Sequence, residues 1–448
     1  MALLRAWQLL SRSVVVASVL LPMWVAYAWL YVRQERMGAD VPAEAWQRLH
    51  ERYAPRFYRL AVWMKGGLIK IGQILSTRVD LMPVEWTREL SGLQDSVTPV
   101  AWATIRKQLE RTYGRPTAAV FRSLDESAVA AASFGQVHRG VTLDGREVAL
   151  KVKYPDVEGK LRVDLVVFRL SVNLFNLLVP RLDLGAVYTE MSRALRTELD
   201  YVQEARFTRE IGSRFLDRDG VVIPEVIDEL SSPDVICTSW IEGRKITDPG
   251  LLADPRVDRR ALLQRLLWAW VQMMYVDGVF QSDPHPGNLL VQVDAERGLT
   301  LGVIDFGQVK ILPQSFHQRL VRCVMAFALG NGEGLVDGLV ELGLFDGEDR
   351  DRMGPVVVRA MERIRAMDPD RAEGLDFPAL RLEVRGALRQ MKGVVIPHDL
   401  VLYGRTLGLL AGVTHHVAPD VNALALARPL LTEALLGGGP PEDPNASA

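Results

Sequence analysis

The sequence contains the segment Ala130-Ala131-Ala132-Ser133-Phe134-Gly135-Gln136-Val137, and the next predicted strand contains Val148-Ala149-Leu150-Lys151. The first part follows the spacing G-x-G-x-x-G-x-V of loops whose backbone N–H groups approach phosphate oxygens, with alanines at the first two glycine positions. Asp144-Gly145 before the second part is a hairpin turn signal. A lone buried ammonium is costly, so Lys151 is expected to have an anionic partner. An alanine-rich turn or a strand lysine alone would be unremarkable structure, but together they predict a phosphate-binding hairpin.

Two further motifs offer oxygen atoms that suit a divalent cation. They read Gln281-Ser282-Asp283-Pro284-His285-Pro286-Gly287-Asn288 and, directly after an apolar strand, Asp305-Phe306-Gly307. Asp283 can accept or orient a hydroxyl proton, whereas Asn288 and Asp305 can bind Mg²⁺ through oxygen. His285 is interpreted as stabilising its loop by a hydrogen bond. The four motifs in this order predict ATP binding and phosphoryl transfer.

Composition sets broad limits on the class of protein. The 448 residues are 48% hydrophobic and 24% charged, with a formal net charge of −2. This length allows two or three domains or lobes, and the near-neutral charge gives no basic excess for a nucleic-acid partner. Only Cys237 and Cys323 are cysteines, too few for a disulfide framework, which favours a reducing compartment.

The N-terminal segment departs from globular composition. The 20 residues from Ser13 to Val32 carry no charge, about the length of an apolar helix that crosses a bilayer. A transmembrane anchor is the favoured interpretation, and the denser basic residues after the segment favour a cytoplasmic main body. The alternatives are a cleaved signal peptide, for which Ala26-Tyr27-Ala28 offers a cleavage site, and a helix packed on the protein's own surface.

Periodicity and turn signals predict the organisation of the chain. Strand patterns lie within 117–153, at Val235–Ser239, Asn288–Val293 and Leu301–Ile304, and a strong helix covers 258–276. The expected parts are a hydrophobic segment (1–36), a helical extension interrupted at Pro42, Pro55, Pro83 and Pro99 (37–115), a strand-containing lobe with a helical insert (116–240), a helical lobe (241–436) and a disordered tail (437–448).

Two other segments, Lys70-Ile71-Gly72-Gln73 and Glu198-Leu199-Asp200, complete a pattern with the alanine-rich loop. From about residue 60 to 310 the chain thereby resembles the UbiB family of atypical kinases, also called AarF or ADCK, with its K-x-G-Q signature and E-x-D segment. The resemblance implies an α+β, two-lobed, protein-kinase-like fold. It would have a small strand-containing N-lobe with helical insertions, a helical C-lobe, and an N-terminal helical extension carrying the K-x-G-Q motif.

The resemblance also implies which residues form the site. Asp283, Lys151 and Lys70 would be catalytic, and Asn288 and Asp305 would bind Mg²⁺. The residues expected to contact ATP are Ala130, Ala131, Ala132, Ser133, Phe134, Gly135, Val137, Lys151, Glu204, Ser239 and Ile241. The residues expected to regulate the site are Lys70, Gly72, Gln73, Glu198 and Asp200. In this scheme Glu204 pairs with Lys151, while Glu198 and Asp200 lie near Lys70. On pattern alone, Lys70 would be a solvated surface residue. Glu198, Asp200 and Glu204 would be the polar side of an amphipathic helix.

The functional expectation is a membrane-associated atypical kinase or ATPase with ATP and Mg²⁺ as cofactors. The resemblance implies isoprenoid quinone biosynthesis or lipid handling, with a membrane lipid or quinone precursor and quinone-biosynthesis enzymes as partners. No A-P-E motif follows Asp305-Phe306-Gly307, which argues against peptide substrates. The alternatives are a small-molecule phosphotransferase of the aminoglycoside or choline kinase type and a non-catalytic nucleotide-binding scaffold for membrane lipid enzymes.

Overall fold

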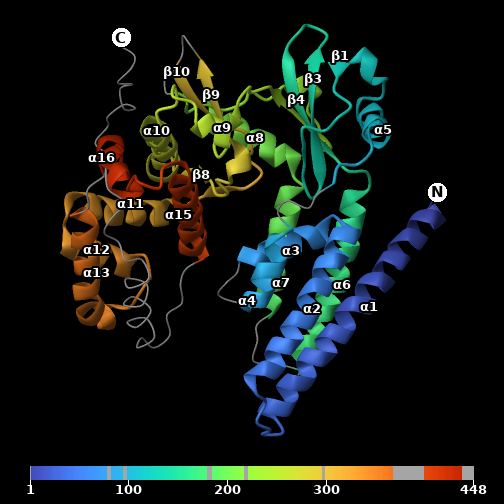
Figure 1. Cartoon of the computed structure of the whole chain (residues 1–448), viewed down its shortest axis with the longest axis horizontal. Helices are drawn as coiled ribbons and strands as arrows, with labels where there is room; N and C mark the ends of the chain where they lie inside the picture. The colour runs from blue at the N-terminus through green and yellow to red at the C-terminus, as the bar shows by residue number, and fades with distance from the viewer. Residues whose placement is uncertain are drawn as a thin grey trace. The chain divides into compact units, whose positions relative to one another are not determined.

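The computed structural model describes residues 2–77, 82–93, 98–178, 184–215, 220–294, 298–366 and 398–435. By its internal contacts the chain divides into two units, whose elements are labelled in Figure 1. The first unit comprises Met1–Gln203 and Val226–Trp240, and the second comprises Glu204–Glu225 and Ile241–Ala448. The tail predicted at 437–448 lies outside the described residues.

The first unit contains a five-stranded antiparallel sheet with the order β1-β3-β4-β6, in which β2 also pairs with β3. Its strands are β1 (Phe121–Leu124), β2 (Ala130–Ala131), β3 (Gly135–Thr142), β4 (Glu147–Lys153) and β6 (Val235–Ser239). The predicted β3–β4 hairpin is confirmed, and Gly145 in its turn has φ +93°, which favours glycine. Val148, Leu150 and Val152 alternate along β4 and are fully buried, so one face of the sheet lies on the core.

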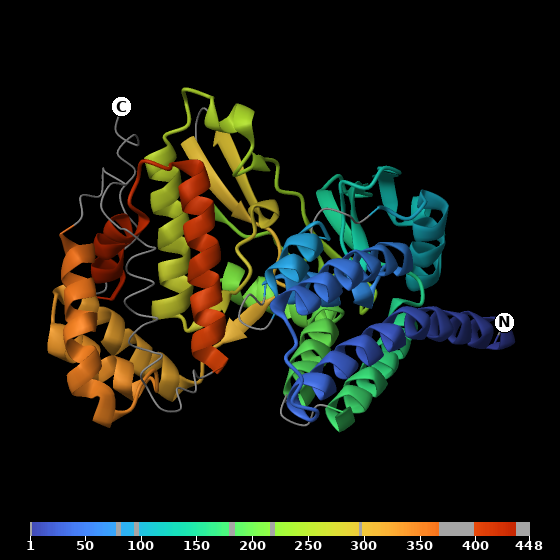
Figure 2. The same cartoon turned by 60° about the horizontal axis from the view of Figure 1, so that its bottom comes forward.

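Helices α1 to α7 complete the core of the first unit. They are α1 (Ala2–Glu35), α2 (Ala43–Met64), α3 (Gly67–Thr77), α4 (Val84–Ser91), α5 (Trp102–Tyr113), α6 (Val157–Leu178) and α7 (Leu184–Glu198). Figures 1 and 2 show α1, α2 and α6 side by side, and α1 contacts both of the others. One hydrophobic cluster includes Leu20 of α1, Ile71 of α3 and Leu150 of β4. The helical extension and the sheet therefore share one core.

The prediction that Pro55 interrupts the helical extension is wrong, because α2 continues through it. A proline inside a helix removes one backbone hydrogen bond, and its ring clashes with the carbonyl four residues earlier, so packing must compensate for both. The buried Tyr53, Ala54 and Phe57 on either side hold this stretch of α2 against the core. Helix α8 (Tyr201–Gly212) follows α7 and contributes residues to both units.

The second unit is mostly helical around two small sheets. One sheet has the order β5-β10-β9-β7, and β11 pairs with β8 in the other. Its strands are β5 (Val221–Val222), β7 (Arg244–Lys245), β8 (Val279–Gln281), β9 (Leu289–Asp294), β10 (Gly298–Val303) and β11 (Val309–Ile311). Its helices are α9 (Pro249–Leu252), α10 (Arg259–Val271), α11 (Gln314–Leu329), α12 (Gly332–Glu341), α13 (Arg350–Arg365), α15 (His398–Val417) and α16 (Ala423–Leu435). Short helical turns lie at Gln272–Val276, Pro286–Asn288 and Gly347–Asp349 in this unit, and at Thr117–Ala119 and Asp228–Leu230 in the first unit.

The core of the second unit forms around α10. Leu262, Leu263, Leu266 and Trp270 are buried on several sides of this helix, as expected for a helix that is apolar all round. The predicted helix over 258–276 is present as α10 followed by a π-helical turn, and the two strands predicted after it are β9 and β10. This core supports the ends of β8 and β10, from which the motif residues extend.

Candidate functional site

The alanine-rich loop is a tight turn between β2 and β3. The backbone N–H of Ala132 donates to the carbonyl of Gly135 (2.8 Å) and closes the turn. A Cβ atom on Gly135 would lie 2.5 Å from the Val152 carbonyl oxygen and 2.6 Å from Tyr201 Oη. Glycine is therefore required here by close packing within the first unit. The side chain of Phe134 lies in the core, which leaves only its backbone available to a ligand.

Lys151 lies at the centre of the sheet, opposite Val137 on β3 and Ile236 on β6. Its Nζ is 5.3 Å from the centre of the Tyr201 ring, and Nζ of Lys153 is 5.2 Å from the same ring. Side chains two residues apart project from the same face of a strand, and both ammonium groups gain a cation–π contact there. The first unit thus gathers positive charge beside its alanine-rich turn.

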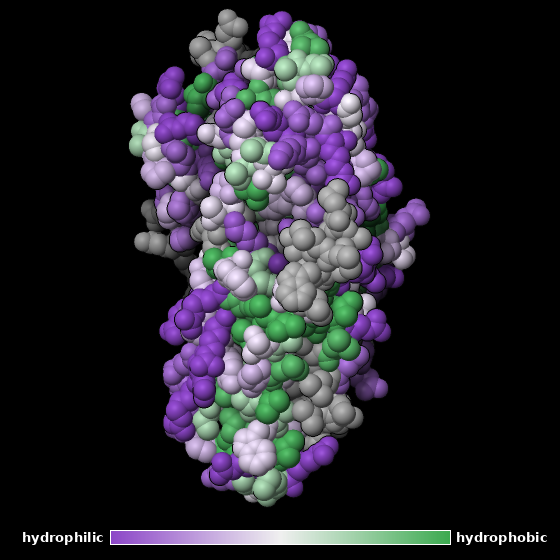
Figure 3. All heavy atoms as spheres, turned by 90° about the vertical axis from the view of Figure 1, so that its right-hand side faces the viewer, coloured by the Kyte–Doolittle hydropathy of each residue, from purple (hydrophilic) through white to green (hydrophobic). Residues whose placement is uncertain are grey.

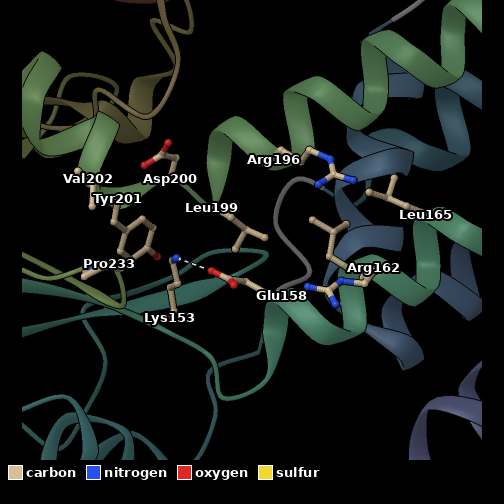
Figure 4. A pocket seen from close by; sticks show the side chains of 11 residues that line it. Lys153, Glu158, Arg162, Leu165, Arg196, Leu199, Asp200, Tyr201, Val202 and Pro233 are labelled. Carbon is tan, nitrogen blue, oxygen red and sulfur yellow. Dashed lines mark hydrogen bonds and ion pairs between the residues drawn. The ribbon is translucent and has the colours of Figure 1, made fainter. Parts of the chain in front are cut away.

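A cavity of about 330 Å³ opens next to this charge (Figure 4). The charged and aromatic residues that line it are Lys153, Glu158, Arg162, Arg196, Asp200 and Tyr201. In Figure 4 Lys153 and Glu158 point toward each other, and the Lys153 Nζ–Glu158 Oε1 distance is 3.0 Å. Because Lys153 is buried, this ion pair satisfies an ammonium group that would otherwise be costly to bury.

The K-x-G-Q segment lies on α3 and connects to two other predicted site segments. Lys70 Nζ lies 2.6 Å from Glu198 Oε2, with both side chains less than one-fifth exposed. Ser133 Oγ in the alanine-rich turn donates to Gln73 Oε1 (3.4 Å), and Gln73 Nε2 donates to the Leu93 carbonyl (2.9 Å). The structure therefore brings Lys70 next to Glu198, as the resemblance implied. Their regulatory or catalytic roles stay predictions.

Gly72 and Asp200 have clear structural roles of their own. A Cβ atom on Gly72 would lie 2.2 Å from Leu93 Cδ1, so any side chain there would collide with the packed neighbour. Asp200 Oδ1 accepts a hydrogen bond from the backbone N–H of Gln203 (2.9 Å) and thereby caps the N-terminus of α8. Both residues position the elements that carry the site.

In the second unit, Glu204 lies beside the Asp305-Phe306-Gly307 turn. A Cβ atom on Gly307 would lie 3.2 Å from Asp305 Oδ1 and 3.4 Å from Glu204 Oε2. The backbone N–H of Gly307 donates to Asp305 Oδ1 (2.8 Å) and orients this carboxylate, while Phe306 is buried below. Glu204 and Lys151 belong to different units, so their pairing stays a prediction.

The last two residues expected to contact ATP lie in different units. Ser239 pairs with Val148 in the first unit's sheet, whereas Ile241 lies beside Gly302 of the second unit.

Gln281 links the two motifs of the second unit, a role that sequence reasoning missed. It is buried, and its Nε2 donates to the carbonyls of Asp283 (2.7 Å) and Asp305 (3.3 Å). Its Oε1 accepts from the backbone N–H of Asp283 (3.1 Å). The available signal was its place two residues before Asp283 on a buried strand, where protein kinases have His of the His-Arg-Asp motif.

The loop from Asp283 to Asn288 is held by short-range hydrogen bonds. The backbone N–H of Gly287 donates to His285 Nδ1 (3.1 Å), the loop-stabilising contact predicted for this histidine. Asn288 Nδ2 donates to the Asp283 carbonyl (3.4 Å), and the N–H of Ile304 donates to the Asn288 carbonyl (3.1 Å). Asn288 therefore lies beside the residue that precedes Asp305.

Helix α15 adds two residues that the sequence motifs did not indicate. Arg405 Nη2 lies 3.8 Å from Asp283 Oδ1, and Thr406 Oγ1 donates to the Ser282 carbonyl (3.1 Å). More than a hundred residues separate them from this loop, so only the tertiary fold shows their proximity. Arg405 places a permanent positive charge near Asp283, the residue predicted to accept a proton.

The donor set of the second unit suits Mg²⁺ better than a tightly chelated metal. Within the described ranges, no three His, Cys, Asp or Glu side chains converge on one point. Asn288 and Asp305 supply an amide oxygen and a carboxylate. Mg²⁺ typically binds through one or two carboxylates plus substrate phosphates and water, so this sparse oxygen set fits it. It would be a poor site for zinc.

A unit whose antiparallel sheet carries Lys151 and a mostly helical unit that carries the paired aspartate motifs define a kinase-like protein. Residues 92–338 match the ABC1 atypical kinase-like domain, and the chain belongs to this family. Arabidopsis thaliana protein ACTIVITY OF BC1 COMPLEX KINASE 1, chloroplastic, is 31% identical over 388 residues, which cover 84% of this chain and 54% of that protein. Xenopus laevis AarF domain-containing protein kinase 1 is 28% identical over 308 residues, which cover 68% and 59% respectively.

A solved structure shares the fold. The Rv3197–erythromycin complex from Mycobacterium tuberculosis aligns with a TM-score of 0.57 and 26% identity over 87% of this chain and 98% of that one. The predicted family and the two-lobed kinase-like fold are thereby confirmed. The chain spans only about half to two thirds of the two curated relatives above.

Proposed function

We propose that this chain is an ATP-dependent atypical kinase or ATPase that uses Mg-ATP. The observation that carries the proposal is the Gln281 side chain, which bonds to the backbone of both Asp283 and Asp305. Two separate motifs are thus fixed to each other by a buried amide. Such preorganisation is needed when charges must be positioned for phosphoryl transfer.

The residues of the two units would have separate roles in phosphoryl transfer. Lys151 and the backbone of the alanine-rich turn would hold phosphate oxygens, and Asn288 and Asp305 would hold Mg²⁺. The cation, when bound, neutralises charge on the phosphates and their leaving oxygen. Asp283 would orient the attacking hydroxyl or water and accept its proton. Arg405, 3.8 Å from Asp283, would stabilise negative charge on the acceptor side.

Two features favour a small or lipid-linked acceptor over a peptide. Only a short segment with β11 lies between Gly307 and the start of α11 at Gln314, so no long activation segment follows the motif. In the first unit, α3 is fastened to the alanine-rich turn and to α7 through Gln73 and Lys70. Taken with the family resemblance, these features support a role in isoprenoid quinone or lipid metabolism at a membrane.

The test is Mg-ATP binding and phosphate release by the full chain. Asp305→Asn should weaken Mg²⁺-dependent ATP binding about ten-fold or more, because a carboxylate that faces the cation is neutralised. Asp283→Asn should retain binding and lose turnover. Asp420→Asn, an exposed carboxylate change in the same unit, is the matched control and should alter neither.

Three outcomes would argue against the proposal. Unchanged ATP binding in Asp305→Asn would remove the assigned metal site. Full cellular function of Asp283→Asn would favour a nucleotide-binding scaffold. Rapid phosphorylation of a soluble polar alcohol would favour the aminoglycoside or choline kinase type of activity.

A further inference from the structure

Helix α1 is apolar on two opposite faces, although one of them is exposed. Val16, Leu20 and Met23 are buried against the first unit. On the opposite side, Val14, Leu21, Val25 and Trp29 recur at helical spacing and are 62%, 43%, 59% and 59% exposed, respectively. A helix on the surface of a soluble protein normally presents charged and polar residues to water. Figure 3 shows hydrophobic side chains gathered on the face of the molecule that carries α1.

Several contacts fix helix α1 to the first unit. Arg12 forms a buried ion pair with Asp164 of α6 (Nε–Oδ1 2.6 Å). Further along, the Tyr27 hydroxyl is hydrogen-bonded to His50 Nδ1 of α2 (2.7 Å) and accepts from Trp86 Nε1 of α4 (2.9 Å). Tyr53 Oη of α2 donates to the Pro22 carbonyl (3.2 Å). By length and composition α1 could cross a bilayer, but these contacts make it part of the folded unit.

The neighbouring helix α2 presents a row of positive charge. Arg48, Arg52, Arg56 and Arg59 follow one another at spacings of four, four and three residues, which places them on one face, and all are exposed. The described part of the chain gives none of these four arginines a carboxylate partner. Trp63, 68% exposed, continues the same face. Arg52 and Arg56 lie over the Tyr53 ring, and Arg59 donates to the Pro55 carbonyl. Guanidinium groups without a carboxylate partner, next to an exposed indole, suit the phosphate level of a lipid leaflet.

Helix α1 and the arginine row border the same groove. A hollow of about 420 Å³ is lined from α1 by Val15, Ser18, Val19 and Pro22, and from α2 by Tyr53, Arg56, Arg59, Leu60 and Trp63. Arg56 and Arg59 therefore stand level with the middle of α1. If α1 crossed the bilayer in this arrangement, these arginines would be carried to the hydrocarbon core, where charged side chains are strongly disfavoured.

We propose that α1 lies in the plane of an anionic membrane leaflet instead of spanning the bilayer. Val14, Leu21, Val25 and Trp29 enter the boundary between headgroups and acyl chains, and the α2 arginines contact lipid phosphates. This orientation satisfies both the exposed apolar row and the unpaired charges. The inference deepens the membrane association of the proposed function and is independent of nucleotide binding.

The depth of single labels in a membrane distinguishes the two orientations. Ser11, Ser18 and Val25 are seven residues apart on the exposed face of α1, and the native Cys237 and Cys323 are buried. Full-length chains with Ser11→Cys, Ser18→Cys or Val25→Cys would carry an environment-sensitive fluorophore in vesicles with lipid-attached quenchers. An in-plane helix gives three similar, shallow depths. A spanning helix gives depths that increase by about 10 Å at each step, because each residue rises about 1.5 Å, and this result would overturn the proposal.

Vesicle binding tests the role of the arginines. The full chain should cosediment with phosphatidylcholine vesicles that contain about 30% phosphatidylglycerol, and less at high salt. Arg52→Gln/Arg56→Gln/Arg59→Gln should reduce partitioning by about five-fold for each charge removed. Equal binding of this variant and the unmodified chain would contradict the assigned surface.

The matched control removes three exposed arginines from or near α5 of the same unit: Arg106→Gln/Arg111→Gln/Arg115→Gln. It changes net charge by the same amount and should retain nearly all vesicle binding, whereas equal losses would mean nonspecific attraction and reject the proposal. Far-UV circular dichroism confirms that both variants fold. Mg-ATP binding, measured on the same samples, should be unchanged, so a failure of the membrane surface is separable from a failure of the nucleotide site.

Discussion

Substitution of Gly72 by alanine should destabilise the first unit through one methyl group. The added Cβ would lie 2.2 Å from Leu93 Cδ1 and 3.4 Å from Phe57 Cε1, and both neighbours are buried. Overpacking of a closed core costs about 1–3 kcal/mol. Alanine in a helix gains up to about 1 kcal/mol over glycine. The clash should exceed this gain and move α3, with the Lys70–Glu198 and Gln73–Ser133 contacts that it carries.

The matched control is Gly159→Ala in the first turn of α6 of the same unit. A Cβ atom there meets nothing within 4 Å. This variant gains helix propensity without a clash, so the difference between the two alanine variants isolates the packing term, about 1–3 kcal/mol. Urea unfolding followed by tryptophan fluorescence and far-UV circular dichroism measures it. Mg-ATP titration reports whether the displaced α3 also changes nucleotide binding.

Two results would contradict the predicted clash between Ala at position 72 and Leu93. Gly72→Ala could prove as stable as Gly159→Ala, which would mean that the space beside Leu93 is not closed. Alternatively, Leu93→Ala could cost the same in the Gly72→Ala background as in the unmodified chain. Residues in direct contact should not behave additively, because removal of the Leu93 branch relieves the clash.

Three further predictions concern polar groups. Gln281→Leu keeps the volume but removes the amide that joins the two motifs of the second unit, so phosphate release should fall about ten-fold or more while far-UV circular dichroism is unchanged. Burial lowers the pKa of His138 below its usual 6.5, so the folded state disfavours the charged ring. The free energy of unfolding is therefore highest above about pH 6.5, where the ring is neutral in both states, and it decreases as the pH falls through the lowered pKa. His138→Phe should flatten that part of the pH dependence of urea unfolding. Arg12→Gln leaves the buried Asp164 carboxylate unpaired and should cost about 3–5 kcal/mol at neutral pH; because burial raises the pKa of Asp164, protonation at acid pH should reduce this cost, and adding Asp164→Asn should recover part of it at neutral pH.

Local patterns predicted the elements that carry the motifs. The alternation of apolar residues on β4 and the Asp144-Gly145 turn specify a hairpin within a few residues of chain, so the position of Lys151 followed directly. The same holds for Asp305, which ends an apolar strand. Pro55 was misjudged because tertiary packing of the flanking residues outweighs the loss of one helical hydrogen bond.

Contacts between remote segments could not be read from periodicity. From the sequence, Gly72 was only one residue of the K-x-G-Q signature. The structure shows why glycine is needed there: the Leu93 side chain, on the segment after α4, leaves no room for a Cβ atom. Arg405 approaches Asp283 from α15, and nothing in its own helix marks it as different from a surface arginine. Gln281 stands where protein kinases have the His of the His-Arg-Asp motif, but its bonds to both motifs depend on the pairing of β8 with β11.

Helix α1 and the K-x-G-Q helix α3 are connected through Arg12 and Asp164. Arg12 of α1 donates to the carbonyls of Met64 (2.7 Å) and Lys65 (3.1 Å) at the end of α2, in addition to its ion pair with Asp164. Lys65 has φ +55°, a conformation that costs a non-glycine residue about 1–3 kcal/mol and persists only when its surroundings hold it. A Cβ atom on Gly67, where α3 begins, would lie 3.1 Å from Asp164 Oδ2. The Arg12 guanidinium group therefore contacts both the strained turn at Lys65 and the Asp164 carboxylate beside the start of α3. A displacement of α1 must alter this turn, after which the helix that carries Lys70 begins.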